Sequence, residues 1–202
     1  RGRTREFWQL NIDIFGVAGV EADHEVILVA DTLMKAYGAK PSSYKIKINS
    51  RQFVAHIFRD YLKLEQVQTE ALMRLIDKMH KTPIVEFFSQ VDILLSPSQR
   101  DAGIGKNLAS TLAVRNMGNL PAELQSHPTL AEVNKLFEML GASQVTSAEF
   151  DITLMRGFDY YTDIVFEVFD NHSDNNRAMF GGGRYDGMVG QFGVEPVPTV
   201  GF

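Results

Sequence analysis

Apolar and polar positions alternate near the N-terminus with the period of two that is typical of a β-strand. From residue 7 to 14 one set is apolar, and we expect this set to face a core: Trp8, Leu10, Ile12 and Ile14. The other set includes Phe7, Gln9 and Asp13, which a solvated sheet face or a polar pocket would explain. A helical stripe follows from Glu21 to Tyr37 and should end at Gly38, before a short strand at 44–48.

The pattern changes at about residue 51, where apolar positions begin to recur every three or four residues. Successive helices are predicted up to about Gly141, separated by Pro83, Pro97, Pro121 and Pro128. In the last of them, Thr129 is the expected cap and Gly141 the expected stop. This segment of about 90 residues is interpreted as an all-helical insertion between two β-rich parts.

Strand patterns return at 144–149, and the stretch from Phe150 to Asp170 is predicted to be two strands joined at a tight corner, RGFDYY. That corner holds more polar chemistry than a short turn needs, which suggests a site. Farther on, Gly181, Gly182 and Gly183 follow a strand pattern. They are weak evidence for phosphate binding, because tight packing against a neighbouring strand explains them equally well. Residues 196–202 should begin another strand.

Composition narrows the class of protein without identifying it. The 202 residues are 45% hydrophobic, as in an ordinary globular domain, and the net charge of -5 argues against a generally basic surface while permitting a local basic cleft. Without cysteine there is neither a disulfide framework nor a thiolate metal site, and the five scattered histidines make bound zinc improbable. No apolar run has the length of a membrane span, so we expect a soluble, cytoplasmic protein.

Three stretches, in this order, resemble histidyl-tRNA synthetase, a class II aminoacyl-tRNA synthetase: GRTREFWQLNIDIFG from Gly2, LMRGFDYYTDIVFE from Leu154, and GGGRYDGMV from Gly181 with PTVGF after it. The resemblance implies an α+β fold, with a class II antiparallel sheet flanked by helices. It also implies three parts: catalytic residues 1–50, a helical insertion at 51–143, and catalytic residues 144–202. Motif 1, the start of motif 2 and the motif 3 arginine have no counterpart here, so a central fragment of a catalytic domain, inactive in isolation, is expected.

The resemblance also implies roles for individual residues, carried over position by position. Arg156 matches the arginine at the α-phosphate of ATP, Phe7 the aromatic that stacks on adenine, and Arg5 and Arg3 the loop that faces ATP and the acceptor end of tRNA. Gln9 matches the residue that holds the α-amino group of histidine. Asp13 and Tyr161 match the contacts to the two imidazole nitrogens, with two further tyrosines close by: Tyr160 and Tyr185.

The implied reaction is attack of the histidine carboxylate on the α-phosphate of ATP, release of pyrophosphate, and transfer to tRNA(His), with Mg²⁺ accompanying ATP and a homodimer in the full-length protein. A fixed guanidinium would stabilise the charge that develops, and the ionised carboxylate needs no general base. Two alternatives stay open. One is a non-catalytic, histidine-sensing regulatory subunit of ATP phosphoribosyltransferase, and the other is a sensor module that binds tRNA without charging it. The joint presence of Arg156, Phe7 and Asp13 favours the enzyme.

Overall fold

A computed structural model describes residues 6–155, 160–172, 174–175 and 177–202. Its centre is a six-stranded sheet in the order β1-β6-β5-β4-β2-β3. Four of the five strand pairs are antiparallel, and β2 pairs with β3 in parallel. The strands are β1 (Asp13–Phe15), β2 (Tyr44–Ser50), β3 (Ala148–Phe150), β4 (Ile164–Asp170), β5 (Ala178–Arg184) and β6 (Thr199–Gly201). The expected α+β class is therefore confirmed, as a mixed, mainly antiparallel sheet flanked by helices.

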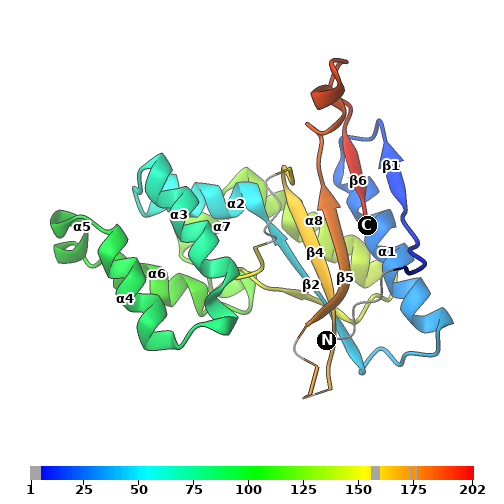
Figure 1. The fold of residues 1–202 in the computed structure, drawn as a ribbon, viewed down its shortest axis with the longest axis horizontal. Helices are drawn as coiled ribbons and strands as arrows, with labels where there is room; N and C mark the ends of the chain where they lie inside the picture. Colours follow the sequence, from blue (N-terminus) through cyan, green and yellow to red (C-terminus); the bar gives the residue numbers. More distant parts are fainter. Residues whose placement is uncertain (1–5, 156–159, 173, 176) are drawn as a thin grey trace.

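Two long helices, α1 (Val20–Ala36) and α8 (Pro128–Ala142), pack against each other and lie behind the sheet in Figure 1. The core between them and the sheet includes Ile27, Ile46, Ile48 and Phe166, all fully buried. Burial of such side chains is the main source of stability for this layer. The expected helix after Gly19 and the strand at 44–48 are thus present, and Gly38, with φ of +86°, follows the end of α1.

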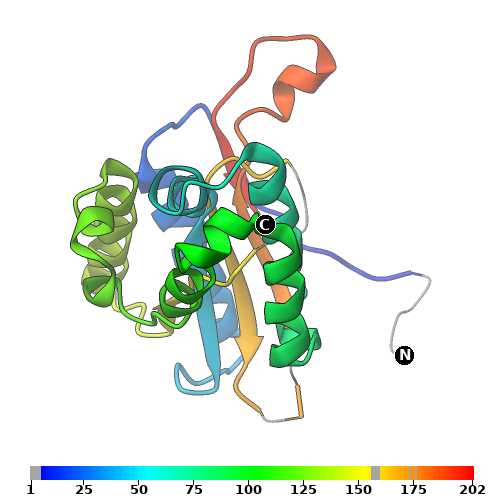
Figure 2. The same cartoon turned by 90° about the vertical axis from the view of Figure 1, so that its left-hand side faces the viewer.

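Apart from the short η4 (Val189–Phe192), which lies between β5 and β6 in the chain, the remaining helices form a second group, beyond the β2 and β4 side of the sheet (Figures 1 and 2). Ser50 begins this group, because its hydroxyl accepts a hydrogen bond from the Phe53 amide and caps the first helix. The elements are α2 (Arg51–His56), a π-helical turn η1 (Ile57–Tyr61), α3 (Gln66–Asp77), η2 (Met79–Lys81), α4 (Ile84–Leu94), α5 (Pro97–Asp101), α6 (Ile104–Leu112), η3 (Met117–Asn119) and α7 (Ala122–Gln125).

Helix α8 differs at both ends from the expectation. His127, not Thr129, is its N-cap, and the Nδ1 atom of His127 accepts a hydrogen bond from the Thr129 amide at 3.3 Å. Pro128 occupies the first helical position, which suits a residue without an amide hydrogen. The helix also continues one residue past Gly141, and the positive φ that follows it belongs to Gln144.

The hairpin predicted for residues 150–170 is wrong. β3 and β4 do not pair, because β2 lies between them and binds one on each side. After Phe150 the chain leaves the ladder, and the next five residues, 151–155, are all buried instead of alternating. Asn49 of β2 holds this segment, since its side-chain amide donates to the carbonyl oxygens of Ile152 at 3.1 Å and Leu154 at 3.0 Å.

The N-terminal strand is shorter than predicted and its apolar set is only partly buried. β1 begins at Asp13, although Ile12 already exchanges two backbone hydrogen bonds with Phe202. Ile14 packs against the core, whereas Trp8 is fully exposed and Leu10 is 57% exposed. The reason is that β6 is the neighbour of β1 in the described sheet, and residues 7–11 extend past it without a strand beside them.

The glycines 181–183 lie within β5 and not after a strand. A Cβ atom at Gly183 would lie 2.5 Å from the Ile164 carbonyl oxygen and 2.9 Å from a ring carbon of Tyr161, and one at Gly182 would collide with the backbone of Gly201. Close packing of neighbouring strands therefore explains these glycines, in keeping with the second of the two readings of the sequence.

Candidate functional site

The candidate site lies on the sheet face opposite α1 and α8, where β1, β5 and β6 meet. Asp13 is paired in register with Gly201 of β6, which is paired in turn with Gly183 of β5. The hydroxyl of Tyr185, the residue after β5, donates a short hydrogen bond to the Asp13 carboxylate. Gly201 lies beneath both groups, and a Cβ at this position would collide with the carboxylate. Glycine is thus required for Asp13 and Tyr185 to meet here.

Three tyrosine rings form one wall of the site. The ring centroids of Tyr160 and Tyr161 are 4.5 Å apart, and Tyr185 stands edge-on to both at 6.0 Å and 6.2 Å. Tyr161 is buried against Leu154 and Val165, so its position is determined by packing. Burial raises the pKa of Tyr185, and the neighbouring Asp13 carboxylate raises it further. The Tyr185 hydroxyl therefore stays protonated and donates to a carboxylate that accepts.

Of the residues predicted from the sequence, the structure brings together Asp13, Tyr160, Tyr161 and Tyr185. Phe7 is 71% exposed, and the exposed Gln9 donates to the side chain of Asn11 at 2.7 Å. Both residues precede β1, so the pairing with β6 that positions Asp13 does not extend to them. The remaining predictions lie outside the described residues: Arg3, Arg5 and Arg156.

Sequence reasoning assigned no role to the side chains of β2 that support the segment before Arg156. Besides the amide of Asn49, Lys47 contributes an ion pair at 2.7 Å with Asp151. The other carboxylate oxygen of Asp151 accepts from the Thr153 hydroxyl at 2.6 Å and from the Thr153 amide at 3.0 Å. Burial raises the pKa of Asp151, but the Lys47 ammonium and the Thr153 donors outweigh it and lower the pKa. The sequence carried no separate signal for Asn49, because it continues the polar alternation of Lys45 and Lys47 along the strand.

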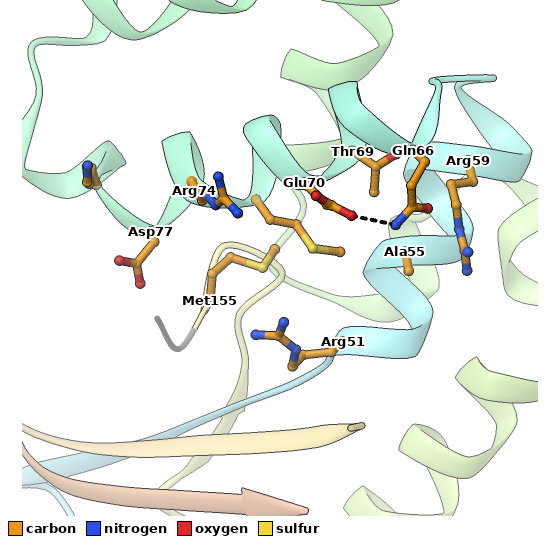
Figure 3. A pocket seen from close by; sticks show the side chains of 11 residues that line it. Arg51, Ala55, Arg59, Gln66, Thr69, Glu70, Arg74, Asp77 and Met155 are labelled. Atoms are coloured by element: carbon orange, nitrogen blue, oxygen red, sulfur yellow. Dashed lines mark hydrogen bonds between the residues drawn. The ribbon is translucent and has the colours of Figure 1, made fainter. Parts of the chain in front are cut away.

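A groove of about 650 Å³ lies between the helical group and residue 155. Its walls come from α2, η1 and α3, and Figure 3 shows Arg51 and Met155 facing the helix that carries Glu70 and Arg74. Glu70 accepts a hydrogen bond from Gln66 at 2.8 Å. Four cationic side chains and two carboxylates line the groove, giving it a positive balance in an acidic chain: Arg51, Arg59, Arg74 and Lys78 against Glu70 and Asp77.

The basic side chains of this groove lie on the surface. Arg59, Arg74 and Lys78 are exposed, whereas Tyr161 and Arg184, next to Tyr185, are buried. Met155 lines the groove and directly precedes, in the sequence, the residue for which the α-phosphate contact was predicted. Exposed guanidinium and ammonium groups on two facing walls are suited to the phosphates of a polyanion.

Within the described ranges, no three His, Cys, Asp or Glu side chains are grouped so that they could hold a metal ion. Among the same residues, none of the helices combines the length and the apolar character needed to cross a membrane.

Solved structures resemble this fold over nearly the whole chain. The histidyl-tRNA synthetase from Nostoc sp. PCC 7120 superposes with a TM-score of 0.79 at 18% identity, covering 95% of this chain and 46% of that one. A protein from Bacillus halodurans, described as an ATP phosphoribosyltransferase regulatory subunit/histidyl-tRNA synthetase, superposes with a TM-score of 0.76 at 25% identity, covering 95% of this chain and 49% of that one. The sheet and its helices therefore have the fold of a class II aminoacyl-tRNA synthetase.

Sequence comparison gives the family. The family model described as histidyl-tRNA synthetase matches residues 1–202. A histidine–tRNA ligase of Leptospira biflexa is 34% identical over 204 residues, and one of Halorubrum lacusprofundi is 34% identical over 209 residues. Each match covers 100% of this chain and 46% of the relative, so the chain spans about half the length of the curated relatives it matches. The chain belongs to the histidyl-tRNA synthetase family, as its three sequence stretches had indicated.

Proposed function

We propose that this chain is the part of a histidine–tRNA ligase that recognises histidine and takes part in its activation. The observation that carries the proposal is the pairing of Asp13 with Tyr185 beside Tyr160 and Tyr161, in a chain of the histidyl-tRNA synthetase family. Imidazole has two ring nitrogens, one a donor and one an acceptor when neutral. A carboxylate and a phenol on opposite sides satisfy both.

Selectivity follows from the same groups. Tyr161 is buried, Tyr160 and Tyr185 are half-buried and Asp13 is exposed, so a bound amino acid would itself cover these groups. An amino acid that lacks either ring nitrogen would leave Asp13 or a tyrosine hydroxyl covered and without its partner. Unpaired polar groups of this kind can reject an analogue by roughly 10⁴ or more. In the proposal Tyr161 contacts the second nitrogen, Tyr160 and Tyr185 complete the wall, and Gln9 holds the α-amino group.

For the activation step, we assign Arg156 to the α-phosphate and Phe7 to the adenine ring, with Arg5 also facing ATP. The carboxylate oxygen of histidine forms a bond to the α-phosphorus while the bond to pyrophosphate breaks, and Arg156 stabilises the negative charge on the non-bridging oxygens. Mg²⁺ accompanies ATP and would be held largely by its phosphates.

The second substrate is tRNA(His). The groove lined by Arg59, Arg74 and Lys78 supports this part of the proposal, because it offers exposed cations next to the segment of Arg156. Counterion release on binding a polyanion would then make affinity salt-dependent. Arg3 is proposed to face the acceptor end. The division into residues 1–50, 51–143 and 144–202, the homodimer and the cytoplasmic location belong to the same proposal.

The test is charging of tRNA(His) with labelled L-histidine by the product of the complete gene that encodes this chain. Tyr185→Phe removes only the hydroxyl that donates to Asp13, and we expect kcat/KM for histidine to fall about 10- to 100-fold, the value of a hydrogen bond to a charged group. Tyr37→Phe is the matched control, since Tyr37 is 86% exposed at the end of α1. Equal activity of the two variants would contradict the assignment of Tyr185.

A second candidate function is a regulatory subunit of ATP phosphoribosyltransferase, because the solved structure from Bacillus halodurans carries both descriptions. The same gene product distinguishes the two functions. A regulator would make ATP phosphoribosyltransferase activity respond to histidine and would leave tRNA uncharged. Charging without such a response supports the ligase.

A further inference from the structure

Arg184, the last residue of β5, is 4% exposed and directly precedes Tyr185. All three of its guanidinium nitrogens are used. Nε donates to both carboxylate oxygens of Asp23 at 3.2 Å and 3.1 Å, and Nη2 donates to Asp23 at 2.5 Å. Nη2 also donates to the Gly19 carbonyl at 3.0 Å, and Nη1 to the Val17 carbonyl at 3.1 Å. These acceptors all come from a single turn and the helix after it.

That turn continues from the strand that carries Asp13. β1 ends at Phe15, and Val17 and Gly19 connect it to α1. A planar guanidinium has five donors in a fixed fork, and those of Arg184 serve two carbonyl oxygens and two carboxylates at once. Lysine, with three donors on a single nitrogen, cannot reproduce that arrangement. Arg184 thus ties the exit of β1 to the end of β5.

The backbone of the same residue holds the tyrosine segment. The carbonyl oxygen of Arg184 accepts from the Thr162 amide at 2.7 Å and from the Thr162 hydroxyl at 3.3 Å. The Thr162 hydroxyl in turn accepts from the Asp186 amide at 3.2 Å. Thr162 follows directly after Tyr161, so its anchorage restricts where that ring can lie.

Asp186 extends the connection to β6. Its carboxylate accepts from Arg184 Nη1 at 3.3 Å and from the Thr199 amide at 2.9 Å. Thr199 is the first residue of β6, the strand whose Gly201 lies beneath Asp13 and Tyr185. All the segments that build the candidate site therefore meet at one buried arginine.

We infer that Arg184 is a positioning residue for the histidine site, with Asp23 as its buried counter-ion; the histidine part of the inference rests on the proposed function. Arg184 contacts Asp23 on the helix side of the sheet, whereas the hydroxyl of Tyr185 meets Asp13 on the opposite face. A binding site of this kind needs each polar group to stay within about 0.5 Å of its productive position. Residues on loops keep such positions only when other side chains support them.

A purely stabilising role is a weaker explanation. The desolvation of two buried charges offsets much of their attraction, and burial raises the pKa of Asp23 to about 6 even though Arg184 is beside it. Asp163, whose pKa burial also raises, and Asp186 lie near the same guanidinium. A well-packed apolar pair can often replace such an ion pair without loss of stability, but it offers no donors for Val17 and Gly19.

The experiment compares wild type with Arg184→Lys, which keeps the charge opposite Asp23 and loses the forked donors. Three hydrogen-bonded amides report on the three segments by NMR-detected hydrogen exchange: Gly16 bonds to Pro198, Thr162 to Arg184, and Tyr185 to Thr199. The Ile46 amide, bonded to Ser147 at 2.8 Å, is the control on the far side of the sheet. We expect exchange at the three amides to accelerate about tenfold together, with Ile46 unchanged. Unchanged exchange at all three, or equal acceleration at Ile46, would overturn the inference.

The same substitution in the product of the complete gene that encodes this chain, titrated with L-histidine, tests the connection to function. We expect Arg184→Lys to weaken binding about tenfold, and wild-type affinity in this variant would overturn the inference. If wild type itself binds no histidine, the proposed function fails, and the exchange at Gly16, Thr162 and Tyr185 still decides whether Arg184 positions these segments. The double variant Arg184→Met with Asp23→Leu leaves no unpaired buried charge and serves if Arg184→Lys does not fold. It should show the same local acceleration and the same weaker binding.

Discussion

The Asp13–Tyr185 site and the groove of the helical group are built in opposite ways. Around Tyr185, the polar groups are supported by buried partners such as Arg184, Asp23 and Thr199, which are 4%, 2% and 0% exposed. In the groove of the helical group, three of the four cations are exposed: Arg59 on η1, Arg74 on α3 and Lys78 directly after it. Polar groups that buried partners hold in fixed positions can discriminate between small molecules, because a mismatched ligand leaves one of them unpaired. An exposed cationic groove attracts phosphates without such discrimination.

The largest effect should come from crowding the sheet beneath the tyrosines. In Gly183→Ala the added Cβ would lie 2.5 Å from the Ile164 carbonyl oxygen and 3.0 Å from the Val165 Cα, and backbone atoms cannot move aside cheaply. We expect the free energy of unfolding, measured in urea, to fall by about 3 kcal/mol. Gly187→Ala is the control, because its Cβ would meet nothing within 4 Å, and it should be neutral. Equal stability of the two variants would show that this part of the sheet is less tightly packed than its geometry indicates.

Asn49 should have the next largest effect. Asn49→Leu keeps the number and branching of the side-chain heavy atoms but removes the two hydrogen bonds to Ile152 and Leu154, leaving buried carbonyl oxygens unpaired. The expected loss of unfolding free energy is about 2 kcal/mol. Asn171→Ala, which removes one exposed hydrogen bond to the Ser42 carbonyl, should cost less than about 0.5 kcal/mol. A small effect at Asn49 would mean that packing alone holds residues 151–155.

Removing cations from the helical groove should weaken the binding of tRNA without changing the free energy of unfolding. We expect Arg59→Ala combined with Arg74→Ala to weaken binding of tRNA about tenfold at moderate salt, and to reduce the slope of log K against log salt by about 1 for each cation removed. Filter binding at several salt concentrations measures both. Lys106→Ala is the control, since Lys106 is exposed on α6 and does not line the groove. An effect of the control as large as that of the double variant would argue against a specific groove.

The smallest expected effect is a pH dependence of stability that arises from His127, at the start of α8. His127 stacks on His56 with ring centroids 3.6 Å apart, and Asp60 pairs with His56 at 2.9 Å. Partial burial lowers the pKa of His127 and the neighbouring His56 lowers it further, while Asp60 opposes the shift. The unfolded chain therefore takes up a proton first, so stability should fall as pH drops below about 6.5.

The loss at His127 should stay under about 1 kcal/mol, since protonation of Nδ1 removes its bond to the Thr129 amide and weakens the cap. Asp23, whose raised pKa is about 6, contributes the opposite slope in the same range, because the folded state then binds the extra proton. Urea unfolding of wild type and His127→Asn at a series of pH values isolates the contribution of the histidine, because asparagine also caps helices but does not titrate. If the free energy of unfolding depends on pH in the same way in both proteins, His127 does not cause the loss.

Local patterns identified the elements that depend on their own neighbours in sequence. The helix that begins near Glu21 and the strand from Tyr44 were predicted because periodicity and the flanking Gly38 determine them locally. The hairpin at 150–170 was predicted wrongly, because alternation does not specify which strand lies alongside, and here β2 intervenes. Trp8 and Leu10 were expected to be buried for the same reason, whereas strand alternation continues beyond the part of β1 that has a neighbour.

The sequence by itself determined the family and the chemistry available at the candidate site: Asp13 and the tyrosines stand in recognisable stretches, and side-chain type does not depend on folding. Only the tertiary structure decided how these groups are supported. Arg184 and Asp23 are 161 positions apart, and Asn49 binds carbonyl oxygens 103 and 105 residues away. Contacts over such separations leave no periodic trace in a single sequence, because they depend on the order of the strands and on which face of the sheet each residue occupies.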